Sequence, residues 1–250
     1  MKSATSYTYS ALGLMAFLIL WEAIAQSGWI ETHLLPPPST LPQTLASEIS
    51  LGIWQTMIWA SLRHYTVGFF LGSLLGVCLG VIVAMCPRIA ASQAWLARVF
   101  RPIPPLAWIP FAIIWFGISQ TAAAFIISIG IFWINYFTAM SAVQTVDKDL
   151  VEVARAFGHR STSALLRTVI LPAAAPGIFS GLRAGLGQGW MTVVAAELFG
   201  IAGIGQRMIE ASGLLASEVV ILYMFSIAAL YGLSDFVFLR VQKRVLNWQR

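Results

Sequence analysis

The stretch from Pro102 to Val146 contains no charged residue, and this constrains the fold more than any other feature of the sequence. Over all 250 residues, 58% are hydrophobic and 10% are charged, whereas an average soluble chain has roughly 25% charged residues. A span of lipid needs about 20 apolar residues in a helix, so the chain has room for about six. The composition therefore predicts an all-α polytopic membrane protein.

The apolar runs place the spans near residues 10–27, 58–86, 90–118, 121–143, 173–199 and 218–240. Gly117 to Gln120 interrupts the long uncharged stretch and is expected to separate two of these helices. The first run has no small-residue cleavage site after it, so we interpret it as an anchor rather than a removed signal. Residues 1–250 are expected to form a single membrane domain.

The distribution of Lys and Arg predicts the orientation of these spans, because cytoplasmic segments carry the excess of positive charge. With the N-terminus inside, Arg207 alone falls in an outer segment. Both termini and the loop at 144–172 are therefore expected in the cytoplasm. The basic excess is explained by orientation and anionic lipid, and we expect no nucleic-acid partner. The inner segments hold Lys2, Arg88, Lys148, Arg155, Arg160, Arg167, Arg240, Lys243, Arg244 and Arg250.

The 144–172 loop carries the densest polar chemistry of the chain and predicts two short helices. Asp149 and Glu152 have capping-box spacing for a helix that begins near Leu150. Apolar residues then recur with helical spacing at Leu150, Val153, Ala154 and Phe157. A short amphipathic helix between membrane spans is typical of a docking element for a soluble partner.

The end of this helix and the start of the next are also marked in the sequence. Gly158 stands where a left-handed C-cap is expected. Ser161 or Thr162 can cap a second helix, and Pro172 is expected to stop it.

These residues resemble a known signature. Glu152-Val153-Ala154, Gly158 and Val169 to Pro172 are similar to the EAA…G…I-x-L-P motif of type I ABC importer permeases. Val153 stands where that family prefers Ala, and the ten residues between Gly158 and Val169 are about one more than usual. The resemblance implies a coupling helix that seats in a groove of an ATP-hydrolysing subunit. The implied coupling residues are Glu152, Val153, Ala154, Arg155, Ala156, Phe157, Gly158, His159, Leu171 and Pro172.

Two further segments narrow the resemblance to one branch. Residues from Pro104 to Gly117 resemble the P-P-L-A-W-[IL]-P-x-x-x-x-W-F-G segment of permeases for taurine, aliphatic sulfonates and nitrate. Gly181 to Trp190 and Val194 to Leu198 resemble the fifth span of the taurine type. The resemblance covers the chain from about Leu35 to Trp248.

The family resemblance also implies partners and a place in the cell. It implies a homodimer in a bacterial inner membrane, with two copies of an ATPase subunit that bind ATP and Mg. An extracytoplasmic binding protein would deliver a small oxyanion, which alternating access would move inward. No cofactor is expected in this chain itself.

Glycine repeats every four residues in two of the expected spans, at Gly68 to Gly80 and at Gly177 to Gly189. Such rows let another helix backbone approach closely. They indicate either a seam that slides during transport or static close packing, and we favour static packing because such rows are common in membrane helices.

The prolines between Pro102 and Pro110 cannot continue a regular helix. A broken helix in a membrane needs surrounding protein or a water-filled cavity, so this segment is expected near the substrate path. A kinked interfacial helix end is the alternative. Aromatic side chains with a few polar groups suit a small polar ligand, although tryptophan is also the usual interfacial anchor. The candidate pathway residues are Trp108, Asn135, Gln188, Trp190 and Thr192.

Charged residues within the spans usually face a partner or a cavity. Arg183 and Glu197 are fourteen residues apart on one expected helix and cannot pair with each other. We expect a structural role for Arg183, water access for Glu197 at the outer end, and structural roles for Glu22 and Asp235.

The sequence lacks the residues that several other classes of function require. There is no G-x-x-x-x-G-K-[ST] loop, so the chain does not bind ATP by that route. Cys78 and Cys86 form no metal or disulfide pattern and the three histidines are scattered, so neither a metal site nor a catalytic site is expected. The alternative to an importer subunit is a self-sufficient secondary transporter, which should show internal repeats and mid-membrane ionisable residues.

Overall fold

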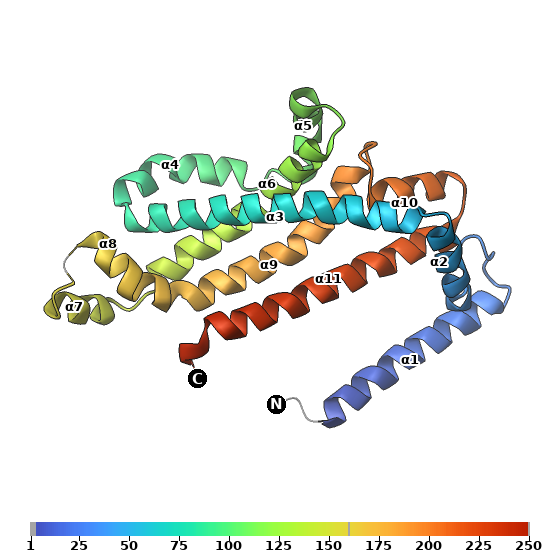
Figure 1. Cartoon of the computed structure of the whole chain (residues 1–250), viewed down its shortest axis with the longest axis horizontal. Coiled ribbons are helices and arrows are strands. Elements are labelled where there is room, and N and C mark those ends of the chain that lie inside the picture. Colours follow the sequence, from blue (N-terminus) through green and yellow to red (C-terminus); the bar gives the residue numbers. More distant parts are fainter. Residues whose placement is uncertain (1–3, 160, 250) are drawn as a thin grey trace.

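The computed structural model describes residues 4–159 and 161–249, and the described part is a bundle of long helices (Figure 1). Lys2, Arg160 and Arg250 of the charge count lie outside the described residues. The elements are α1 (Ala4–Gln26), η1 (Pro38–Thr40), α2 (Leu41–Ser50), α3 (Ile53–Met85), α4 (Pro87–Phe100), η2 (Pro105–Trp108), α5 (Ile109–Phe116), α6 (Gln120–Gln144), α7 (Lys148–Ala156), α8 (Thr162–Leu165), the π-helical η3 (Leu166–Ile170), α9 (Leu171–Glu197), α10 (Ile204–Gly213), α11 (Ser217–Val245) and η4 (Asn247–Gln249).

Four helical runs of the described chain are long and apolar enough to cross a membrane. They are Ile53–Met85, Gln120–Gln144, Thr162–Glu197 and Ser217–Val245, and the apolar part of α1, Ala11–Gln26, is shorter. The all-α membrane fold is confirmed, with four spans, or five if the bent pair α4 and α5 forms one.

The expected span over residues 90–118 is broken in the middle, as the prolines between Pro102 and Pro110 predict. Helices α4 and α5 meet at a bend of 92°. Pro102, Pro104 and Pro105 lie at the bend, where the missing N–H groups and the rings prevent a continuous helix. The predicted break between Phe116 and Gln120 is present as well, with Gly117 in a positive-φ conformation (φ 67°).

Helix α3 packs against α6 at a distance that only glycine permits. A Cβ atom added at Gly72 would lie 2.5 Å from the carbonyl oxygen of Ser128, and one at Gly76 would lie 2.7 Å from that of Phe132. Side chains on this face of α3 would therefore collide with the backbone of α6. The first glycine row is a seam of close packing between two helices.

The second glycine row, on α9, meets α6 as well, but it meets side chains instead of backbone. A Cβ atom added at Gly177 would lie 2.6 Å from Ala142 Cβ, and one at Gly189 would lie 2.8 Å from Ile131 Cδ1. Helix α6 is thus held between two glycine rows, and α3, α6 and α9 form the packed centre of the bundle.

The two ends of the bundle differ. Helices α7 and α8 lie at the end where α11 finishes, whereas α2 and α10 lie at the opposite end (Figure 1). Helix α2 falls in the segment 28–57 that separates the first two expected spans. Glu22 at the end of α1 accepts hydrogen bonds from the backbone nitrogen (3.0 Å) and the hydroxyl (2.7 Å) of Ser39, so it has the expected structural role.

A buried ion pair fixes α2 to the neighbouring helices. Arg207 of α10 donates to both carboxylate oxygens of Glu48, at 2.6 and 3.2 Å, and the Tyr223 hydroxyl donates to the same carboxylate at 2.9 Å. Burial raises the pKa of Glu48, but the bonds from Arg207 and Tyr223 outweigh it and hold that pKa below its ordinary value. The sequence alone did not indicate this cluster.

Candidate functional site

The 144–172 segment forms the predicted pair of short helices, but its first cap differs from the prediction. Helix α7 begins at Lys148, and Asp147 is its N-cap, with a side-chain oxygen that accepts from the backbone nitrogen of Asp149 at 3.0 Å. The expected capping box of Asp149 and Glu152 is therefore wrong. Asp147 caps the free N–H groups instead, because the helix starts two residues before the expected position.

Gly158 ends α7 as the sequence predicted. Its φ is 95°, its backbone nitrogen donates to Arg155 O at 3.1 Å, and the nitrogen of His159 donates to Ala154 O at 3.0 Å. These two bonds are the pair that defines a Schellman cap. Because a β-branched residue is strongly disfavoured at positive φ, the chain reversal depends on this glycine.

The apolar side chains of α7 mostly point away from the protein. Ala154 is buried against Leu165 and Ile170, but Leu150 and Val153 are exposed and Phe157 is 83% exposed. Glu152, Arg155, Ala156 and His159 are exposed as well. A helix outside the spans that presents apolar groups in this way has a surface suited to a partner.

Helix α8 begins at Thr162, and its N-cap is Ser161, whose hydroxyl accepts from the nitrogen of Ala164 at 3.2 Å, so this predicted cap is confirmed. Pro172 does not stop the helix, contrary to expectation, since one helical run extends over Thr162–Glu197. The π-helical turn Leu166–Ile170 lies directly before Leu171 and Pro172. A π-turn accommodates one more residue than an α-turn and relaxes the bonding around the proline, so the helix continues.

The two halves of the motif meet in the structure. Leu150, Val153, Ala154, Val169, Pro172 and Trp248 line one hollow of about 440 Å³.

A second candidate region lies among the spans. The proline break, α6 and α9 enclose a cavity of about 330 Å³, lined among others by Arg101, Pro105, Trp133 and Gln188. The structure therefore brings Gln188 and the broken segment together within one chain. Trp108 lies at the same break, half-buried between Phe100 and Phe111.

The other three pathway candidates lie in the packed interior. Trp190 is 2% exposed and stacks on Tyr65 with ring centroids 4.3 Å apart. Asn135 is buried and donates to Ser73 Oγ at 2.9 Å. Thr192 is buried behind Gln188 and donates to its carbonyl oxygen at 2.9 Å. Of the pathway candidates on α6 and α9, Gln188 alone lines the cavity at the proline break.

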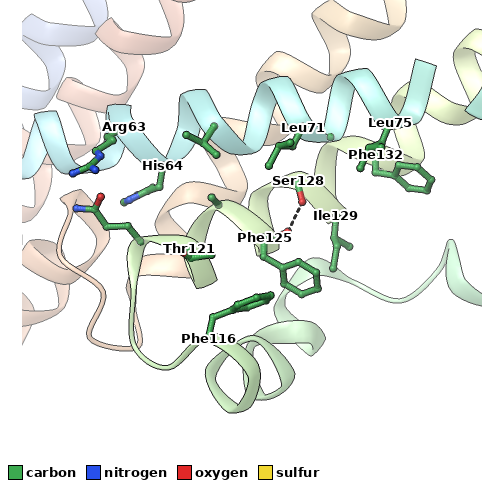
Figure 2. Close-up of a pocket in the computed structure, with 14 residues that line it drawn as sticks. Arg63, His64, Leu71, Leu75, Phe116, Thr121, Phe125, Ser128, Ile129 and Phe132 are labelled. Carbon is green, nitrogen blue, oxygen red and sulfur yellow. Dashed lines mark hydrogen bonds between the residues drawn. The ribbon is translucent and has the colours of Figure 1, made fainter. Parts of the chain in front are cut away.

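A larger cavity of about 510 Å³ lies between α3 and α6 (Figure 2). Its walls are mainly apolar, with Phe116 and Phe125 on one side and Leu71 and Leu75 on the other. Arg63 and His64 also line it, toward the end that α2 and α10 occupy.

Glu197 lies inside the protein, which contradicts the expectation of water access. The side chain is fully buried and accepts from Ser61 Oγ at 2.6 Å and from the backbone nitrogen of Gly205 at 2.6 Å, and it also bonds His64 Nε2. Because α10 folds back over the end of α9, this carboxylate binds α3 and α10 together.

Arg183 has the structural role that the sequence predicted, and its partner is Asp235. The guanidinium of Arg183 donates to both carboxylate oxygens, at 2.6 and 2.8 Å. This bidentate pair links α9 to α11.

Comparison with known proteins agrees with this geometry. Residues 76–248 match the family of binding-protein-dependent transport system inner membrane components. The chain is 32% identical over 245 residues to the taurine transport system permease protein TauC of Escherichia coli, covering 95% of this chain and 89% of that protein. It is 34% identical over 205 residues to the bicarbonate transport system permease protein CmpB of Synechococcus elongatus, covering 77% of this chain and 73% of that protein.

The fold has solved counterparts too. A chain of the MetNI methionine ABC transporter in an inward-facing conformation superposes with a TM-score of 0.69 and 21% identity. The match covers 79% of this chain and 98% of that chain. At this identity the likeness shows a shared fold.

Proposed function

Because this chain belongs to the family of binding-protein-dependent transport system inner membrane components, we propose that α7 couples it to an ATP-hydrolysing subunit. The chain is the transmembrane permease subunit of an ABC importer, and such a subunit works with an ATPase and a binding protein. The proposal concerns how these partners engage it. The exposed apolar face of α7 beside the hollow at Pro172 is the observation that supports it.

The described basic residues support an orientation with α7 in the cytoplasm. Lys148 and Arg155 of α7 lie at the same end of the bundle as Lys243 and Arg244 at the end of α11. Positive charge concentrates on the cytoplasmic side. On this assignment both termini are cytoplasmic in the bacterial inner membrane, and α2 and α10 face the binding protein.

Each chain presents one α7, whereas ABC importers close two ATP sites together. The proposed assembly is therefore a homodimer with two ATPase copies, in which ATP and Mg bind to the ATPase subunits. Closure of the ATPase pair would draw the two α7 helices together and switch the spans between outward-open and inward-open states. The proposed substrate is a small oxyanion, a sulfonate such as taurine, nitrate or a similar anion, in line with the taurine and bicarbonate relatives.

The test compares two glycines that both have a positive φ angle and lie at opposite ends of the bundle. Gly158 (φ 95°) and Gly52 (φ 71°) both have no atom within 4 Å of an added Cβ, so valine at either position strains the backbone without a steric clash. We expect Gly158→Val to lose co-purification of the ATPase and ATP-driven uptake, while Gly52→Val retains the ATPase. Glu152→Ala should reduce coupling without strain. Equal ATPase retention and equal uptake by Gly158→Val and wild type would contradict the assignment.

A further inference from the structure

One arginine sits at the break of the bent pair without a carboxylate partner. Arg101 is the C-cap residue of α4, and its guanidinium carbon lies 4.5 Å from the centroid of the Phe137 ring of α6. Phe137 lies in the half of α6 nearer to α7, well inside the helix Gln120–Gln144. The positive charge therefore stands beside the interior part of a membrane-spanning helix.

Two other arginines of the helical bundle have carboxylate partners, whereas Arg101 has none among the described residues. Arg183 is paired with Asp235 and Arg207 with Glu48, but within residues 4–159 and 161–249 no carboxylate forms an ion pair with Arg101. A charge within the membrane is costly and usually faces a bundle interior or a water-filled cavity. The Arg101 side chain is exposed on the single chain. We therefore expect it to face either a water-filled route or a second copy of the chain.

The cavity that Arg101 lines has the composition of a ligand site. Its volume of about 330 Å³ lies at the small end of the range for ligand pockets, roughly 300–1,000 Å³. Thr138 and Gln188 supply polar groups, and Trp133 and Phe137 supply aromatic walls. The Gln188 amide nitrogen has one long contact, 3.4 Å to Thr192 Oγ1, so it retains capacity to donate to a ligand.

Gly130 keeps this cavity open at the point where three segments meet. A Cβ atom there would lie 2.8 Å from Thr192 Oγ1 and 3.2 Å from Pro105 Cγ. Ile129, the adjacent residue, lines both this cavity and the larger cavity that contains Arg63. The two cavities are therefore neighbours along α6, and each has an arginine in its wall.

We propose that the cavity at Arg101 is a transit site for a small oxyanion, with Arg101 binding two oxygens of one sulfonate, nitrate or bicarbonate group and Gln188 donating a further hydrogen bond. The inference rests on the proposed function and names the residues that recognise the substrate class. A guanidinium presents a planar fork of N–H donors that matches two oxygens on one centre. The Trp133 and Phe137 rings border the remaining space, where a short organic group is accommodated.

Binding to the purified permease in lipid nanodiscs, with its ATPase subunit present, tests this site. The probes are taurine, methanesulfonate, nitrate and bicarbonate, and the readout is isothermal titration together with the shift in the unfolding midpoint. We expect at least one anion to bind, Arg101→Gln to weaken it at least tenfold, and Arg101→Lys to retain part of the affinity. Gln188→Leu should weaken it several-fold.

Arg98→Gln is the matched control, because Arg98 is an exposed arginine one turn earlier on α4 that does not line the cavity. It should bind the anion as wild type does. Absence of binding to wild type, unchanged affinity in Arg101→Gln, or an equal loss in Arg98→Gln would each overturn the proposal. If Arg101→Gln does not fold, the lysine and Gln188 variants decide the question.

Uptake by cells that carry the complete importer separates this inference from the proposed function. Uptake that persists at the wild-type rate in Arg101→Gln would refute the site and leave the importer function intact. Wild-type cells that take up none of the probes, although the purified protein binds one, would instead count against the proposed transport of oxyanions.

Discussion

Replacing Gly76 by alanine should force α3 and α6 apart. The new Cβ would lie 2.7 Å from Phe132 O, 2.9 Å from Asn135 Cβ and 3.1 Å from Tyr136 N. Ordinary contact begins at 3.4 Å, so the helices must separate by about 0.7 Å at this point. The opposing atoms belong largely to the backbone of α6, which cannot turn aside as a flexible side chain can.

The size of the effect follows from two opposing terms. Overpacking of this kind costs about 1–3 kcal/mol, and alanine recovers up to about 1 kcal/mol because it favours the helix over glycine. With the full recovery, the net loss is up to about 2 kcal/mol. For a chain of this size that corresponds to a fall of up to roughly 8 °C in the unfolding midpoint.

Gly232→Ala is the control, because an added Cβ at Gly232 in α11 meets no atom within 4 Å. Only the propensity term applies there, so the midpoint should rise by a few degrees at most. Both variants and wild type are compared by thermal unfolding in the same detergent. A midpoint for Gly76→Ala at or above that of wild type would refute the packing argument, since the seam would then have room for a methyl group.

Three further predictions concern single sites. Glu197→Gln should lower the unfolding midpoint, because both carboxylate oxygens of the buried Glu197 accept hydrogen bonds and an amide NH2 group cannot accept at one of these positions. The loss is expected at about 1–3 kcal/mol, and an unchanged midpoint would contradict the buried cluster. Since Arg207 holds the pKa of Glu48 below its ordinary value, the stabilisation from Glu48 is complete above that ordinary value, about 4.3, and is lost as the pH falls further. Glu48→Gln should therefore be less stable than wild type at pH 7 and lose less stability between pH 5 and pH 3. For orientation, an impermeant thiol reagent should label Leu214→Cys but not Ser161→Cys in intact cells, and labelling of Ser161→Cys would reverse the proposed topology.

Local signals in the sequence predicted local structure well. The caps at Gly158 and Ser161 are correct because a positive-φ glycine and a capping hydroxyl act within a few residues of their position. The glycine rows are correct for a similar reason, since their four-residue spacing by itself places all members on one helix face.

Two of the errors involve contacts or helix geometry that a linear pattern does not contain. Pro172 was expected to end a helix, but a π-turn before it changes the bonding. Glu197 was expected to meet water, but α10 covers it. In each case a residue distant in sequence, or a shift of helical register, decides the environment.

The arrangement of the glycine rows bears on how movement at α7 would reach the substrate cavity. Helix α8, the π-turn and α9 form one run over Thr162–Glu197, and Ala154 of α7 packs against Leu165 and Ile170 of this run, so a displacement of α7 acts on α9 through these contacts. Helix α9 is held to α6, and α6 to α3, through contacts too close to slide without a large energetic cost. The three helices should therefore move as one body.

The break between α4 and α5 has no such glycine seam among the described residues, and it forms one wall of the Arg101 cavity. A rigid three-helix body that moves against this broken segment would open and close the cavity at Arg101.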